Sequence, residues 1–360
     1  MWRRLPETFQ YDVRYVNPAE VRADLVRVWR DNLPVDQEAD AKFDWIYRKA
    51  VEPPAGVFVL AARSSTAHTI VGTAGLAVRK FFVDDTSLRA GLLADLAVDR
   101  EHRTAMPALR LVRSARNAAV SEFDLAYGFP NKSARAVFLR CGYHKLGTLT
   151  RWARVLRHAR YVQRVIPVRS VARLAGAALD AGGFAQLGSR ALTALRTHRI
   201  SWPTEVDDRF DRLWHAARRS YTLVGTRDAA FLRWRFLDQP GHTFRLAALS
   251  RRGEPGDLRA YAVLGREGDH AFIRDLFGHP ADLGPLLDLL LVDLARQGAA
   301  SASMGFLGSE AITRLLQSRG FKARESERTI VCDVGKARGD MAEIIRDVQS
   351  WHLTDADEDT

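Results

Sequence analysis

The sequence predicts a mixed α/β (α+β) protein built from two copies of one fold in tandem, and three observations support this fold class. The chain has 360 residues, which is more than one compact domain usually contains. Stretches with strand-like and with helix-like spacing of apolar residues follow one another through its first half. A series of short motifs from that half recurs, in the same order, in the second half.

The elements of the first half follow from apolar spacing and from turn signals. Residues 11–16 alternate as a strand, and Asn17-Pro18 opens a helix that ends near residue 32. The elements after it are a helix at 38–51, strands at 57–63 and 69–83, a strand ending at 98 with a helix after it, a strand at 124–129, a helix from 131, and one long strand from 143 towards 156. The predicted order is therefore strand, two helices, three strands, helix, strand, helix, strand.

The stretch at 92–112 is the most informative part of this order. An apolar run that ends at Val98 predicts a buried strand, residues 99–103 form a charged turn, and apolar residues from Leu109 onward recur at helical spacing. Because the amides of the first helical turn have no partner within the helix, a turn of this kind is a natural cradle for phosphate.

The second half repeats motifs of the first. Trp234 stands where the first half has Trp45, and Asp275 interrupts an apolar run as Asp95 does. The glycine–aromatic pairs at 128–129 and 142–143 return at 305–306 and 320–321. Four matches in the same order are hard to obtain by chance, so we predict two copies of one fold. A shared core role for the two tryptophans is favoured over a substrate platform.

These repeats define the expected boundaries. We expect an N-terminal domain at 1–157, a helical linker at 158–204, a C-terminal domain at 205–352 and an acidic tail at 353–360. The linker is Arg-rich, then small and glycine-rich, and has no strand pattern. The acidic residues from Asp355 onward are expected to form a solvated, frayed end.

Composition limits the location and the partners of the protein. The chain is 47% hydrophobic and 27% charged, as soluble globular proteins are. No charge-free run of about eighteen apolar residues occurs, so we expect a cytoplasmic protein without a membrane span. The net charge of +11 comes from scattered arginines. It fits a base-composition bias, a basic rim for a phosphate-rich ligand or, less well, an RNA-binding surface; we expect no DNA partner. Two cysteines, Cys141 and Cys332, predict neither a disulfide framework nor a metal site.

Two segments resemble the acyl-CoA-binding core of the Gcn5-related N-acetyltransferase family. The first is 92–112. The second is 131–143, in which the family pattern is matched by Asn131, Ala134, Val137, Gly142 and Tyr143. The resemblance covers residues 11–156 at the level of motifs and 207–334 at the level of pattern. It implies that each copy is a mixed, mostly antiparallel sheet flanked by helices, and that acetyl-CoA or another acyl-CoA is the co-substrate.

The resemblance also implies which residues contact the cofactor. The backbone of Leu96, Ala97 and Val98 would bind the pantetheine arm as if it were an added strand. The pyrophosphate would lie on the turn that contains Arg103, Thr104, Ala105, Met106 and Ala108. Met106 replaces the family's glycine and Pro107 removes an amide donor, so we expect weakened phosphate binding with Arg103 supplying charge. Asn131, Ala134 and Phe138 would lie beside the cofactor, and Asn131 suits a helix N-cap equally well.

Attack of an amine on a thioester needs a base for the ammonium proton and is helped by an acid near the thiolate. Asp95 is the candidate base, because a lone acid in an apolar strand is costly unless it is functional or paired; a salt bridge to an arginine is the alternative. The family often has its acid at the position that Phe138 occupies here. Tyr143 is the remaining candidate acid, and core packing is the alternative for it as for Tyr127.

The leading hypothesis is an acyl-CoA-dependent N-acyltransferase, most simply an N-acetyltransferase. It would act on a primary amine of a small molecule or amino sugar, by direct attack in a ternary complex. In the second copy Asp282 would repel phosphate, so we expect that copy to have lost cofactor binding and to close one wall of the cleft. The alternatives are an aminoacyl-tRNA-dependent transferase of paired fold, which the positive charge suits, and a non-catalytic acyl-CoA-binding module.

Overall fold

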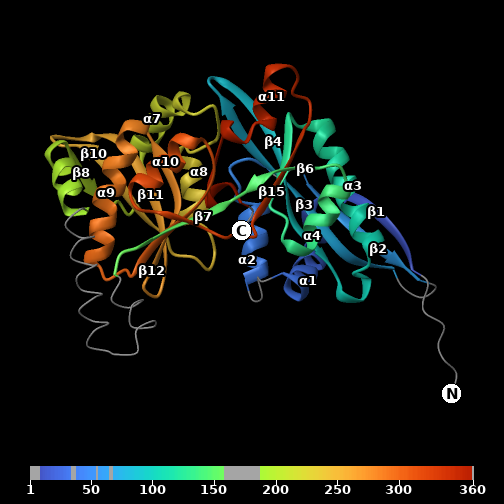
Figure 1. Cartoon of the computed structure of the whole chain (residues 1–360). Coiled ribbons are helices and arrows are strands. Elements are labelled where there is room, and N and C mark those ends of the chain that lie inside the picture. Colours follow the sequence, from blue (N-terminus) through green and yellow to red (C-terminus); the bar gives the residue numbers. More distant parts are fainter. Residues whose placement is uncertain (1–8, 34–37, 54–55, 65–67, 158–186, 359–360) are drawn as a thin grey trace.

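A computed structural model describes residues 9–33, 38–53, 56–64, 68–157 and 187–358. The strands of these residues are linked into one continuous mixed sheet. Its two parts, which we call the first and the second sheet, lie side by side, each with helices on both faces (Figure 1). The mixed α/β class predicted from the sequence is confirmed. Residues 158–186 of the predicted helical linker lie outside the described residues.

The first sheet contains the strands expected from the first half of the chain. They are β1 (Gln10–Val16), β2 (Gly56–Arg63), β3 (His68–Val83), β4 (Thr86–Val98), β5 (Leu125–Gly128) and β6 (His144–Thr148). Strands β1 to β4 pair antiparallel in sequence order, whereas β4 and β5 are parallel. A parallel pair needs a crossover, and helix α3 (Ala105–Glu122) provides it.

Helices cover both faces of this sheet. On one face, Leu111, Val112, Ala115 and Ala119 of α3 recur at helical spacing and are fully buried, together with Phe138 of α4 (Lys132–Arg140). The other face carries α1 (Arg22–Asn32) and α2 (Ala39–Tyr47). Before α1, Asn17 caps a short helical turn, η1 (Pro18–Val21), as the Asn-Pro pair predicted.

The second half repeats this order of elements. Its strands are β8 (His198–Ser201), β10 (Arg245–Arg251), β11 (Glu254–Glu267), β12 (His270–Gly278), β13 (Ser301–Gly308) and β14 (Lys322–Arg324). Its helices are α7 (Asp208–Ala217), α8 (Ala229–Leu232) with the helical turn η5 (Arg233–Leu237), α9 (Pro280–Arg296) and α10 (Glu310–Ser318). Strand β8 lies in the predicted helical linker, which was wrong there: its four residues pair at the sheet edge with β10, too short a run to show alternation.

The two sheets exchange one strand each. Strand β7 (Thr150–Val155) pairs with β13 and β14 of the second half, and β15 (Thr329–Val334) pairs with β5 and β6 of the first. In Figure 1 the green β7 accordingly lies beside strands of the second half. The single long strand predicted from residue 143 is therefore two strands in two sheets. A boundary at 157 does not separate two independent sheets.

The C-terminal segment joins the halves further, through α11 (Asp340–Arg346), β16 (Trp351–Leu353) and η7 (Asp355–Asp357). Strand β16 pairs with β13 and with β9 (Leu223–Gly225), and β9 pairs with β3. The expectation of a solvated tail was wrong for the described residues, because Asp355 and Asp357 are buried. Their carboxylates meet arginines from elsewhere in the chain: Arg227 binds Asp357 at 2.6 Å, and Arg328 binds Asp355 at 2.8 Å.

Trp45 and Trp234 mark the contact between the halves. Their rings stack with centroids 5.0 Å apart. The indole N–H of Trp45 donates to the carbonyl of Trp234 at 2.7 Å, and that of Trp234 donates to the carbonyl of Trp45 at 3.0 Å. The residues matched in the two sequence repeats thus meet in a reciprocal, two-fold-like contact. No helix within the described residues is both long and apolar enough to cross a membrane.

Candidate active site

Strands β4 and β5 separate partway along their length. Their parallel pairing runs from Ala90 opposite Leu125 to Leu93 opposite Gly128. Beyond Leu93, β4 continues to Val98 and stays paired only with β3 among the described strands. The two strands therefore form a V, which leaves one edge of β4 without a strand partner over residues 94–98.

A bulge in β4 sits at the mouth of this V. The register against β3 shifts between Thr73 and Gly75, and Asp95 has φ 51°. Few residues other than glycine adopt this left-handed conformation, and aspartate is one that tolerates it. The hydroxyl of Thr73 donates to the Asp95 carbonyl at 3.1 Å, and the indole N–H of Trp29 donates to that hydroxyl at 3.2 Å. These contacts hold the bulge in place.

The Asp95 side chain is buried and forms an ion pair with Lys42 of α2, with Nζ and Oδ1 2.7 Å apart. Sequence reasoning left open a salt bridge to an arginine; the partner is instead a lysine. Burial and then the charge of Asp95 raise the pKa of Tyr47, five residues after Lys42 in the same helix, well above its ordinary value. Tyr47 therefore stays protonated at neutral pH.

A cavity of about 650 Å³ fills the V, and we call it the splay cavity. Its volume is in the range of pockets that bind small ligands and cofactors. Residues from both halves of the chain line it. They are Leu33, Glu38, Lys42, Trp45, Leu93, Ala94, Asp95, Leu96, Phe129, Pro130, Asn131, Lys132, Ala134 and Phe138 from the first half, and Gln239, Pro240, His242, Glu327, Arg328 and Glu358 from the second.

The structure brings together five of the residues singled out in the sequence: Asp95, Leu96, Asn131, Ala134 and Phe138 all line the splay cavity. Asn131 caps α4, because its side-chain oxygen accepts a hydrogen bond from the Ala134 amide at 2.9 Å.

Tyr143 is not among the residues that line the splay cavity. Its ring is buried in the core against Phe138, with centroids 5.3 Å apart. Its hydroxyl has no hydrogen-bond partner within the described residues, and burial raises its pKa. A phenol in this position has no direct access to a ligand in the cavity.

The turn after β4 leads into α3, and Thr104 occupies the N-cap position without a side-chain hydrogen bond. The first turn of α3, which begins at Ala105, contains no acidic residue.

The predicted residues around this turn take different positions. Met106 is 59% exposed, so its side chain points away from the core, whereas Ala108 packs against the core. Arg103 folds back towards β4, where it donates to the Val98 carbonyl at 2.8 Å and to the Asn32 side chain at 2.7 Å. Ala97 and Val98 pair with β3 along the edge of β4 that faces away from the V.

The equivalent V of the second half is filled by the chain itself. Strands β12 and β13 pair in parallel from His270 opposite Ser301 to Ile273 opposite Met304. Beyond this point β16 pairs with β13, at Leu307 and Gly308. Asp275, the counterpart expected for Asp95, is fully buried and accepts hydrogen bonds from the hydroxyls of Tyr261 and Thr354, each at 2.7 Å.

Several cavity residues escaped sequence reasoning. Lys42 carries no motif, and only the fold places it beside Asp95. Arg328 and Glu358 reach the splay cavity because of the strand exchange and the buried C-terminal segment. The expectation that the second half closes one wall of the cleft agrees with the position of Gln239 and Pro240 in that wall.

Comparisons with known proteins bear on the fold. No family model and no curated protein matches the sequence. Solved structures do match. One is a protein of unknown function from Enterococcus faecalis V583, described as a probable N-acyltransferase, with 10% identity over 90% of this chain and 72% of that one and a TM-score of 0.61.

Two further matches are GCN5-related N-acetyltransferases. The protein from Anabaena variabilis ATCC 29413 is 12% identical over 91% of this chain and 73% of that one, with a TM-score of 0.60. The protein from Kribbella flavida is 11% identical over 91% and 71% of the two chains, with a TM-score of 0.55. Each likeness spans both halves of the chain. At these identities a likeness establishes the fold, and the chain therefore has the fold of the GCN5-related N-acetyltransferases.

Proposed function

We propose that the protein is an acyl-CoA-dependent N-acyltransferase, most simply an N-acetyltransferase, and that its acceptor is a primary amine of a small molecule. The observation that carries this proposal is the open V between β4 and β5. At residues 94–98, one edge of β4 pairs with no second strand among those described, and it offers main-chain groups to an extended ligand. The splay cavity beside that edge has the volume that such a ligand needs.

In this proposal the pantetheine arm lies along the open edge of β4 at Leu96, Ala97 and Val98. Its thioester points towards Asp95, and its pyrophosphate rests on the amides at the start of α3. The absence of an acid in the first turn of α3 favours an anion there. Arg103 and Val98 are already joined by a hydrogen bond, so cofactor binding would exchange that contact for one to the ligand.

The amine nitrogen attacks the thioester carbonyl, a C–N bond forms, and the C–S bond breaks to release the coenzyme as a thiolate. The proposed proton acceptor is Asp95, whose carboxylate lines the splay cavity. Lys42 contacts that carboxylate, with Nζ and Oδ1 2.7 Å apart, and so helps to fix its position. Tyr143 is left out of the proposed chemistry, since its hydroxyl lies in the core. The thiolate would take its proton from solvent.

A thermal-shift series with coenzyme A and acyl-CoAs of increasing length tests cofactor binding. Ligand that binds the native state raises the melting temperature with the logarithm of its excess over Kd. We expect a shift with acetyl-CoA that is reduced in Asn131→Ala and Arg103→Ala. Leu139→Ala is a control, because this exposed residue of α4 is not among those lining the cavity. No shift with any acyl-CoA would remove the proposal.

Turnover of an amine separates an enzyme from a non-catalytic acyl-CoA-binding module. Asp95→Asn tests the base directly, because asparagine tolerates the left-handed backbone and keeps the size of the side chain. We expect kcat to fall by roughly 10²–10⁴-fold with cofactor binding retained. Unchanged turnover in Asp95→Asn would place the base elsewhere. Clear acyl-CoA binding without turnover of any amine would favour the binding module instead.

A further inference from the structure

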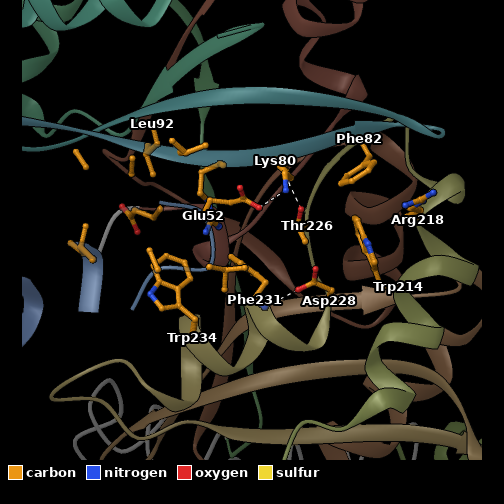
Figure 2. Close-up of a pocket in the computed structure, with 18 of the residues that line it drawn as sticks. Glu52, Lys80, Phe82, Leu92, Trp214, Arg218, Thr226, Asp228, Phe231 and Trp234 are labelled. Carbon is orange, nitrogen blue, oxygen red and sulfur yellow. Dashed lines mark hydrogen bonds and ion pairs between the residues drawn. The ribbon is translucent and has the colours of Figure 1, made fainter. Parts of the chain in front are cut away.

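A second cavity, of about 260 Å³, lies where the two halves meet, and we call it the aromatic cavity (Figure 2). One wall is formed by β3 and β4 of the first half, and the other by α7, α8 and η5 of the second. Leu92 and Ala94, which line it, belong to the core on the sheet face away from α3. The aromatic cavity therefore approaches the sheet from the side opposite the proposed pyrophosphate site.

Aromatic rings are the most distinctive part of its lining. Figure 2 shows Phe231 and Trp234 at one end, and Phe82 and Trp214 at the other. Trp45, which stacks on Trp234, also lines it. Large ring faces favour flat apolar groups. The guanidinium of Arg79 already lies 4.3 Å from the centroid of the Phe231 ring, and that of Arg218 lies 4.9 Å from the centroid of the Phe82 ring. The β3 and β4 wall adds Ala77, Val78 and Leu92, beside Arg79 and Lys80 of the same wall.

Both carboxylates and basic side chains line the cavity. Asp228 accepts a hydrogen bond from the Phe231 amide at 2.8 Å, and Asp211 accepts one from the Ala229 amide at 2.8 Å. Glu52 forms an ion pair with Lys80 at 2.5 Å. Burial, and then the negative charges of Asp211 and Glu52, raise the pKa of Asp228. The charged form of Asp228 is therefore disfavoured as it stands, and a cation placed beside it would stabilise that form.

The basic residues around the aromatic cavity already have partners. Arg79 donates to the carbonyl of Ala356 at 3.0 Å, and Arg218 forms an ion pair with Asp85 at 2.8 Å. Lys80 forms the ion pair with Glu52 that is described above. The carboxylates of Asp211 and Asp228 accept backbone hydrogen bonds, and oxygen lone pairs remain for a further donor.

The aromatic cavity and the splay cavity adjoin. Trp45, Ala94 and Glu358 line both of them. Ala94 is the first residue of β4 after the last pair with β5, so the shared wall lies where the two strands separate. A ligand in the aromatic cavity would approach the proposed thioester position from the opposite side of the sheet.

We infer, resting on the proposed function, that the aromatic cavity binds the acceptor and that this acceptor is a hydrophobic amine with a flat, aromatic body. The rings and the aliphatic wall hold the body. The carboxylates attract the amine as an ammonium ion, and the cavity adjoins the proposed thioester position at the shared wall around Ala94. An aromatic alkylamine fits this description, whereas an amino sugar does not.

Calorimetric titration of the wild-type chain with three probes tests the chemical class. They are 2-phenylethylamine, its uncharged analogue 2-phenylethanol, and glucosamine as a polar amine. We expect 2-phenylethylamine to bind at least about tenfold more tightly than either of the others, since each lacks the charge or the aromatic body. Equal binding of 2-phenylethylamine and 2-phenylethanol, or tighter binding of glucosamine, would overturn the inference.

Variants then locate the site. Asp228→Asn keeps an N-cap oxygen for the Phe231 amide and removes the charge, so we expect the Kd of 2-phenylethylamine to rise about tenfold. Ala77→Phe instead places a phenyl ring in the cavity and should also weaken binding. Asp238→Asn, an exposed acid outside the cavity lining, is the matched control. Equal effects of Asp228→Asn and Asp238→Asn, or tight binding in Ala77→Phe, would place the amine elsewhere.

The thermal shift with coenzyme A, measured on the same samples, separates the two proposals. A normal shift together with no preference for 2-phenylethylamine overturns the acceptor site and leaves the proposed transferase standing. No shift together with selective amine binding that Asp228→Asn weakens supports the amine site and counts against the acyl-CoA function.

Discussion

The two halves of the molecule start from the same V and use it differently. In the first half, β4 and β5 separate after Leu93, and a cavity of about 650 Å³ fills the opening. In the second half, β12 and β13 separate after Ile273, and β16 of the same chain pairs along β13. The second V thus shows what such an opening accepts, namely an extended segment bound through its main chain. This is the kind of ligand proposed for the first V.

The helices that follow the two V-shaped openings also differ, in whether an acidic residue occupies their first turn. Helix α3 starts with no acid in its first turn. Helix α9 starts with Asp282, which is bound by Arg259 at 3.0 Å and by His198 at 2.9 Å. A carboxylate occupies the place at a helix N-terminus that an anionic ligand would take. The second half has therefore filled the opening between its strands and the start of its helix with groups of its own, at the two places that correspond to those proposed for the cofactor in the first half.

The largest expected effect on stability comes from removing the buried cation that binds carboxylates at the filled V of the second half. Arg227 is fully buried and contacts Asp357 at 2.6 Å and Asp275 at 3.5 Å. Arg227→Met leaves these two carboxylates buried without their cation, which should lower the free energy of unfolding by about 3–5 kcal/mol. Chemical denaturation at neutral pH measures the loss. The control is Arg219→Met, whose side chain is 65% exposed beside Asp85, so its loss should change the stability far less.

A smaller but pH-dependent effect comes from His352 in β16. Burial, and then the charge of Arg227, lower the pKa of His352 to about 4 from the ordinary 6.5. Between these values the unfolded chain binds a proton that the native state does not. Stability is therefore intact above pH 6.5 and falls by about 3 kcal/mol as the pH is lowered to about 4.

The comparison with His352→Gln isolates this contribution. Glutamine keeps a donor for the Leu276 carbonyl, to which Nε2 of His352 donates at 3.0 Å, and it does not titrate. The difference between the denaturation midpoints at pH 7 and at pH 4.5 should be smaller in the variant than in wild type. Equal pH dependence of the two proteins would show that the filled V does not keep this imidazole neutral.

Giving the first half the acid of the second should change stability and binding in opposite directions. Met106 is exposed in the first turn of α3, so Met106→Asp should stabilise the helix start by about 0.3–1 kcal/mol. The same charge should weaken coenzyme A binding about tenfold by repelling its phosphates. Met106→Asn, of equal size and neutral, separates charge from shape. Equal binding by the two variants would mean that the pyrophosphate does not lie on α3.

Local patterns predicted local structure well. The strand, turn and helix around Val98 and the N-caps at Asn17 and Asn131 follow from short stretches of sequence, and the structure has each of them. A lone acid in an apolar strand pointed to Asp95, which lies at a bulge beside a cavity. These features depend on residues that are close in the chain, and for this reason the sequence shows them.

Pairing between distant segments could not be predicted in this way. The strand predicted from residue 143 covers β7, but its residues do not say which sheet they join, and the same holds for the residues of β15. An acidic tail has the composition of a solvated end unless its arginine partners are known, and those partners come from distant parts of the chain. Lys42 became a site residue only because α2 packs over the bulge that carries Asp95.

The smallest expected effect tests whether the two halves meet symmetrically. Trp45→Phe and Trp234→Phe each keep an aromatic ring and remove one of the two reciprocal N–H donors. Each should cost about 1 kcal/mol, because one carbonyl loses its partner, and the two costs should be similar. Their sum should differ from the cost of the double variant by about 0.5–1.5 kcal/mol, since the rings stack on each other. Urea denaturation of the four proteins supplies the cycle. Strictly additive costs would mean that each tryptophan serves its own half, and that the matched positions carry no contact between the repeats.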